Sequence, residues 1–285
     1  MKFSRRTLSS TLSFLSRVGW DGVRGFFAVN GMFLSAGLSF YVLIYCFPLL
    51  LLFVSALGYV LSSQRAMAAV EGLLRQLLPA SGFDTTSSLE SLVYQRELLG
   101  MVGVILFLLF GTFLFDAVRY VLNIVFRVTR KRPILKAFGA DAMVMFAMGS
   151  LLGLTMVVTS VLEVTRDLGA RVAWIAPFLE SGWVLVGRGV GFALTGAMLY
   201  LLYRVAPAET LSRRALLVAA FTGACLFEIS KSLFGLYMDQ ARDFTVFYGA
   251  LSGVIFFVLW IYYASAVFTL AAALGRGYES ARSSD

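Results

Sequence analysis

The chain has 285 residues, of which 59% are hydrophobic and 14% are charged, and its formal net charge is +8. A soluble domain of this length could not bury that much apolar surface in one core. The composition therefore excludes an ordinary globular protein and favours one that is solvated by a lipid bilayer.

Six apolar stretches are long enough to cross a membrane, because a crossing needs roughly 20 residues. We predict a helix for each, since a lone strand exposed to lipid would leave its backbone groups unpaired. The run 102–115 is apolar on every side, unlike the alternating pattern of a barrel strand. The predicted fold is all-α: a polytopic membrane protein, 1–285 as a single transmembrane domain, with six transmembrane helices at 31–60, 98–118, 138–162, 182–203, 214–237 and 245–274.

The segments that flank the predicted six-helix bundle at 31–275 also have a pattern. Residues 1–30 mix basic side chains with large apolar ones, which predicts an amphipathic segment in the cytoplasmic interface. Residues 276–285 are predicted to form a cytoplasmic tail. Pro48 stands in the middle of the first span and removes one helical hydrogen bond, which predicts a helix kink there.

The basic residues indicate the orientation. Sixteen of the 24 lysines and arginines lie at the two ends of the chain and in every second gap, and six lie in the other gaps. Positively charged segments stay in the cytoplasm during insertion, so both termini are predicted to be cytoplasmic. Basic residues beside cytoplasmic span ends are also attracted to anionic lipid headgroups, so the net charge does not require a nucleic acid as partner.

The residue types that usually carry catalysis are scarce. The chain has no histidine, and its two cysteines, Cys46 and Cys225, are isolated within predicted spans. It contains no GxxxxGK[ST] phosphate-binding loop and no cluster of carboxylates suited to metal ions. We therefore expect no enzymatic activity, no cofactor and no metal.

Charged residues inside spans are costly and point to function. Asp116 with Arg119, and Glu228 with Lys231, are acid–base pairs three residues apart, so each pair shares one helix face and can neutralise itself. Arg188 lies in the glycine-rich run 187–191. These residues are candidates for a substrate pathway. The alternative is structural: local ion pairs that steady helix packing, and glycines that permit close helix approach.

Two of the candidate segments parallel each other. Residues 111–119 and 223–231 share glycine, leucine and phenylalanine positions and keep the acid and the base in place. The predicted orientation makes the second and fifth spans run in opposite directions. Two three-span halves of opposite orientation would form a 3+3 inverted repeat, an architecture common in transporters.

Several stretches together resemble the YihY/BrkB family of bacterial inner-membrane proteins, formerly mislabelled ribonuclease BN. They are 38–41, 47–50, 115–126, 202–207, 233–237, 248–249 and 259–262. The resemblance implies a six-helix inner-membrane protein, and it adds Asn123 to the candidate pathway. The family tends to end its last span with Gly-Ala-Glu, where this chain has three alanines at 271–273, so any role of that glutamate is in doubt here.

Members of that family have been linked to serum resistance and to the movement of lipid A precursors or phospholipids. The resemblance therefore implies lipid translocation or export for envelope biogenesis, with membrane lipids and a periplasm-spanning lipid-transfer protein as partners. Two alternatives stay open: a non-transporting scaffold for envelope machinery, and a gradient-coupled exporter of a small solute with Glu228 as carrier. The shape of the cavity discriminates between them, because it would open to lipid, open to water, or be absent.

Overall fold

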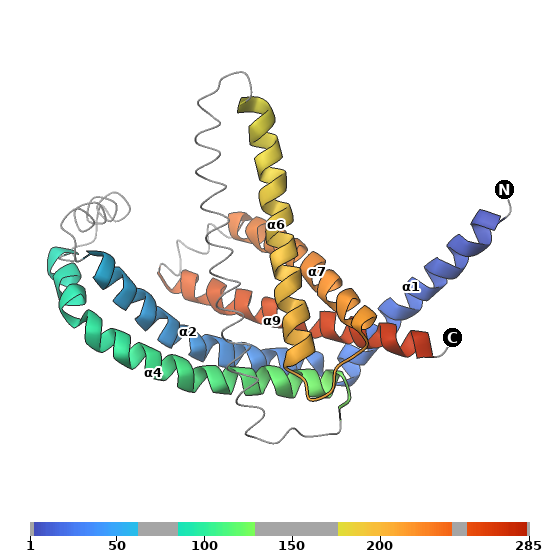
Figure 1. Cartoon of the computed structure of the whole chain (residues 1–285), viewed down its shortest axis with the longest axis horizontal. Helices are drawn as coiled ribbons and strands as arrows, with labels where there is room; N and C mark the ends of the chain where they lie inside the picture. The colour runs from blue at the N-terminus through green and yellow to red at the C-terminus, as the bar shows by residue number, and fades with distance from the viewer. Residues whose placement is uncertain (1–2, 62–84, 129–175, 241–249, 284–285) are drawn as a thin grey trace. The chain divides into compact units, whose positions relative to one another are not determined.

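The computed structural model describes residues 3–61, 85–128, 176–240 and 250–283, and every regular element in these ranges is a helix (Figure 1). The all-α prediction is therefore confirmed for this part of the chain. The helices are α1 (Phe3–Ala28), α2 (Gly31–Leu61), α4 (Thr85–Val125), α6 (Ala176–Val205), α7 (Arg213–Gln240) and α9 (Ala250–Ser283).

Four of these helices carry an apolar segment long enough to span a membrane: Gly31–Ala56, Glu97–Val125, Arg213–Met238 and Leu251–Ser283. They match the first, second, fifth and sixth predicted spans. The fourth predicted span lies within α6, where the apolar segment Gly189–Val205 is shorter than a full crossing. The third, at 138–162, lies outside the described residues. A helical protein with several spans is thus confirmed, and the number six stays a prediction.

The chain divides into two compact units, to both of which α2 and α4 contribute. In the unit 40–114, the two helices pack through small residues: a Cβ on Gly100 would lie 2.7 Å from the Ser55 hydroxyl oxygen. Nearby, the rings of Tyr45 and Phe107 are 5.2 Å apart. α2 stays helical across Pro48, which is fully buried in this packing.

The second unit comprises residues 1–39 and 115–285, and α1 belongs to it. α1 has three faces, as an amphipathic helix at an interface should. Val18, Gly22 and Phe26 are spaced four apart and buried, whereas Trp20 and Phe27 are exposed. The third face is polar and exposed, with Arg17, Asp21 and Arg24. The predicted amphipathic segment is therefore a helix.

Glycines allow α1 and α7 to approach α9 closely (Figure 1). A Cβ on Gly277 would lie 2.7 Å from the backbone nitrogen of Gly22, and one on Gly275 would lie 2.6 Å from the Ala219 Cβ. Small residues at these crossings bring backbones together, which is how helices associate where lipid removes the hydrophobic driving force. The crossings therefore depend on the absence of side chains.

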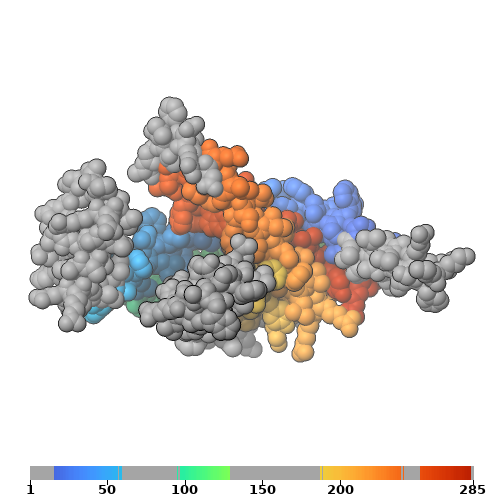
Figure 2. Space-filling view, turned by 90° about the horizontal axis from the view of Figure 1, so that it is seen from above, coloured from blue at the N-terminus to red at the C-terminus, as the bar shows by residue number. Residues whose placement is uncertain are grey.

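The centre of this unit is where α6, α7 and α9 meet, and α6 and α7 lie side by side (Figure 2). Tyr203 of α6 is fully buried, and its hydroxyl donates a 2.8 Å hydrogen bond to the carbonyl of Phe268 in α9. Its ring also lies 5.1 Å from the Phe268 ring and 6.4 Å from that of Phe126. Tyr203 thus joins α9 to α6 and to the residue that follows α4.

The last turns of α9 also form a hydrogen bond with the residue that precedes α7. α9 continues to Ser283, through most of the predicted tail 276–285. The Glu279 carboxylate accepts a 2.8 Å hydrogen bond from the backbone nitrogen of Ser212, just before α7 begins. A negative charge at a helix N-terminus also interacts favourably with the helix dipole.

Candidate functional site

Glu228 and Lys231 form the ion pair that their spacing predicts. Lys231 Nζ lies 2.6 Å from Glu228 Oε1, with side chains 44% and 35% exposed respectively. The same ammonium group lies 5.8 Å from the centre of the Phe227 ring, within range of a cation–π contact. The pair is therefore accessible as well as neutralised, and Lys231 keeps donors that an anionic group could reach.

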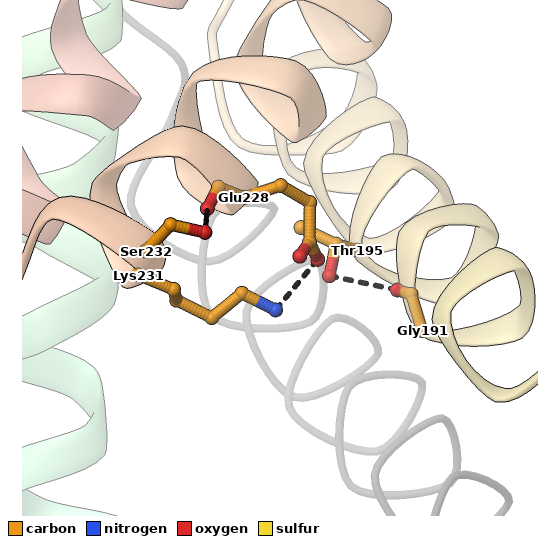
Figure 3. A network of polar contacts seen from close by, with 5 residues as sticks. All are labelled: Gly191, Thr195, Glu228, Lys231 and Ser232. Carbon is orange, nitrogen blue, oxygen red and sulfur yellow. Dashed lines mark hydrogen bonds and ion pairs between the residues drawn. The ribbon is translucent and has the colours of Figure 1, made fainter. Parts of the chain in front are cut away.

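The acid of this pair extends from α7 toward Thr195 of α6 (Figure 3). Thr195 donates a 2.9 Å hydrogen bond to the carbonyl of Gly191, and Ser232 donates one of 3.1 Å to the carbonyl of Glu228. Such bonds satisfy hydroxyl groups within their own helices. The candidate Arg188 lies in α6 as well, but its side chain is outside the described part of the chain.

On the helix that carries the ion pair, α7 and α9 enclose a partly open cavity of about 300 Å³, here called the α7–α9 groove, which neither Glu228 nor Lys231 lines. Two aromatic pairs join the helices beside it: Phe234 with Trp260, at 5.0 Å between ring centres, and Tyr237 with Phe256, at 5.9 Å. The wall is mostly apolar, with hydroxyl groups at a few points, and is formed by Ser230, Leu233, Phe234, Tyr237, Leu259 and Tyr263.

Sequence reasoning missed the α7–α9 groove, although a signal was present. Phe227 and Phe234 are seven residues apart in α7, and Phe256, Trp260 and Tyr263 are four and three apart in α9. These spacings put aromatic side chains on one face of each helix. They do not reveal which two helices meet, and the groove exists because these two do.

The second predicted pair, Asp116 and Arg119 in α4, is also formed, with Arg119 Nη1 3.0 Å from Asp116 Oδ1. In this pair the base is largely buried and the acid is exposed: the Arg119 side chain is 12% exposed and the Asp116 side chain is 71% exposed. Within the described ranges, no ion pair links these two residues to Glu228 or Lys231. A pathway role for either pair stays a prediction.

Asn123, the remaining candidate, makes a contact that supports the fold. Its Oδ1 accepts a 2.9 Å hydrogen bond from the backbone nitrogen of Ala208, in the segment between α6 and α7. The contact is partly buried, and it spans 85 residues of sequence. The side chain therefore supplies an acceptor to backbone that is not in a helix, which gives Asn123 a structural role besides any part in a pathway.

Replacing Asn123 separates these two roles. Asn123→Ala is expected to lower the free energy of unfolding by about 1–3 kcal/mol, because the Ala208 N–H loses its acceptor. Asn123→Asp retains an acceptor oxygen and is expected to lose less. Denaturant titrations of the two purified variants in detergent measure the difference. Equal losses in both variants would contradict the structural role.

The described geometry defines a class of protein: a helical membrane protein with several spans, a partly open groove between two helices and ion pairs on its helices. The chain belongs to the BrkB family, because the family model for the virulence factor BrkB matches residues 23–285. This match confirms the resemblance noted from the sequence.

Three relatives are named UPF0761 membrane protein. That of Pseudoalteromonas atlantica is 25% identical, over 86% of this chain and 80% of its own length. The protein of Azotobacter vinelandii is 26% identical, over 87% of this chain and 60% of its own length. The protein of Alcanivorax borkumensis is 28% identical, over 71% of this chain and 47% of its own length. The chain thus spans only about half to three fifths of the latter two proteins. No solved structure matches the chain.

Proposed function

We propose that this chain moves lipid, a phospholipid or a lipid A precursor, for envelope biogenesis in the bacterial inner membrane. The observation that carries the proposal is the α7–α9 groove, which combines a partly open apolar wall with the Glu228–Lys231 pair on the same helix. A lipid has the same two parts, an apolar chain and a charged headgroup. The chain acts without catalysing a covalent reaction.

The topology that suits this function has six spans and both termini in the cytoplasm; the predicted third span, at 138–162, lies outside the described residues. The parallel between 111–119 and 223–231 supports an inverted 3+3 repeat, because glycine, leucine, phenylalanine, the acid and the base keep the same positions in both segments. A periplasm-spanning lipid-transfer protein is the partner that would receive the lipid.

The test fills the groove. Leu233 and Leu236 are both in α7 and are each 61% exposed, but only Leu233 lines the groove. The purified chain is placed in liposomes that contain a fluorescent phospholipid, and transbilayer movement is measured by quenching the outer leaflet. Leu233→Trp is expected to slow movement about tenfold, the effect of about 1.4 kcal/mol on a barrier, and Leu236→Trp to leave it unchanged.

A scaffold that anchors envelope machinery is the second candidate. It is favoured by the closure of both ion pairs, which leaves each charge neutralised within its own helix. It predicts that lipid moves no faster in liposomes with the protein than in protein-free ones, and that Leu233→Trp changes nothing. That result would overturn the transport proposal.

A further inference from the structure

A second cavity, of about 320 Å³, lies where the end of α1, the end of α4 and the last turns of α9 meet. Its wall includes Arg24, Arg127 and Arg276, one from each region, together with Asp21. Three guanidinium groups against one carboxylate leave the wall net positive. The volume falls within the range of about 300–1,000 Å³ that is typical of small-molecule sites.

The arginines are not needed to complete the two helix ends. At the end of α4, Val128 N donates to the Asn123 carbonyl at 2.8 Å and Arg127 N to that of Ile124 at 3.1 Å. After α1, Asn30 N donates to the carbonyl of Phe27 at 3.0 Å. Backbone groups therefore already satisfy these terminal carbonyls.

In the described part of the chain, the three guanidinium groups also have no protein partner. Within the ranges that the structure describes, no ion pair or hydrogen bond engages the side chains of Arg24, Arg127 or Arg276. An arginine has five N–H donors in a planar fork, and that fork matches phosphate oxygens bidentately. Three unengaged forks around one cavity therefore form a site for a phosphate group.

Arg127 occupies a backbone position where glycine is the usual residue. Its φ is 56°, in the left-handed region that ends many helices and that a residue with a Cβ adopts at a cost. A glycine there would suit the turn better, so the arginine does not serve the turn itself. It follows that Arg127→Gly removes the charge while retaining the backbone.

The cavity lies beside the ends of two candidate membrane spans, where lipid headgroups are expected. Val125, in its wall, ends the span of α4, and Ala28 and Val29, also in its wall, precede the span of α2, which begins at Gly31. Trp20 and Phe27 are exposed on α1, and aromatic residues of this kind gather at membrane interfaces. Within a lipid leaflet, phosphate groups belong to phospholipid headgroups, so a phosphate that enters this cavity from the leaflet is part of a phospholipid.

We propose that Arg24, Arg127 and Arg276 bind a phosphate group, supplied by an anionic phospholipid of the leaflet that borders α1. The same chemistry would accept a soluble phosphate, and the experiment separates the two sources. The site is distinct from the α7–α9 groove and does not require the chain to move lipid.

The test measures lipid adducts of the full chain by native mass spectrometry. The detergent-purified protein is titrated with phosphatidylglycerol, with phosphatidylcholine as the zwitterionic comparison, and inorganic phosphate is tested by calorimetry. The pocket variant is Arg24→Gln/Arg127→Gly/Arg276→Gln. The matched control is Arg204→Gln/Arg213→Gln/Arg214→Gln, which removes three exposed arginines that do not line the cavity.

The pocket variant is expected to bind phosphatidylglycerol more than about tenfold more weakly, since each charged hydrogen bond lost is worth about that factor. The control is expected to bind as the unaltered chain does. Equal weakening in both variants, or none in the pocket variant, overturns the proposal. Phosphate bound at the same site without preference for phosphatidylglycerol overturns the lipid as source.

Ala28→Glu provides a second variant in case the triple one does not fold. Ala28 is exposed at the end of α1 and lines the cavity, so a carboxylate there can pair with the arginines and compete with phosphate. It is expected to weaken phosphatidylglycerol binding about tenfold or more, and unchanged binding counts against the site. Lipid movement can fail in liposomes while this binding persists, so the two proposals are distinguishable.

Discussion

Tyr203→Ala is expected to cost about 3–5 kcal/mol of the free energy of unfolding, the range for truncating a large buried aromatic side chain. Tyr203 is fully buried, and its ring lies against those of Phe126 and Phe268. Removing it leaves a cavity between α6 and α9 and deletes the bond to the Phe268 carbonyl. Chemical unfolding of the purified chain in mixed micelles measures the loss.

Tyr203→Phe separates packing from hydrogen bonding. It keeps the ring and loses only the hydroxyl, so we expect a loss of about 1 kcal/mol. Tyr120, in α4, is exposed, and Tyr120→Ala is expected to change stability by less than about 0.5 kcal/mol. If Tyr203→Ala were no worse than Tyr120→Ala, Tyr203 would not be the residue that joins these helices.

Gly277→Leu is expected to lower the free energy of unfolding by about 3 kcal/mol. A Cβ at this position would lie 2.7 Å from Gly22 N and 2.9 Å from the Val18 carbonyl oxygen. Both are backbone atoms, so neither can move aside as a flexible side chain would, and α1 has to separate from α9. The same unfolding titration measures the loss, and protease accessibility of α1 reports the separation.

Gly253→Leu is the matched control for this substitution. Gly253 lies in the same helix, and a Cβ there would meet no atom within 4 Å. The control is expected to be neutral or slightly stabilising, because leucine has a higher helix propensity than glycine. Similar losses at the two positions would show that the close approach of Gly277 to Gly22 is not what holds α1.

Hydrophobicity and local spacing predicted much of this fold. Apolar runs located the lipid-embedded part of α4, but that helix runs from Thr85 to Val125, beyond the predicted span 98–118. Hydropathy reports the part of a helix that lies in lipid and not the helix ends, which backbone hydrogen bonds decide. The ion pairs of Asp116 with Arg119 and of Glu228 with Lys231 were predictable, because residues three apart meet on any helix.

Contacts between distant segments were not predictable in the same way. Arg24, Arg127 and Arg276 entered the sequence argument only as charges that orient the chain, and no local pattern shows that they line one cavity. The bond from Ala208 to Asn123 and that from Ser212 to Glu279 depend likewise on how helices pack. A single sequence does not record those pairings.

The contact between α1 and the end of α9 has a consequence for biosynthesis. The ribosome makes α1 before it makes the Gly277 region, so α1 cannot dock on this part of α9 until residue 277 has been synthesised. Until then its apolar residues can lie against the bilayer surface. A nascent chain stalled before codon 277 should therefore hold α1 on the membrane yet leave it undocked from α9, and synthesis of the Gly277 region becomes the step that permits this docking.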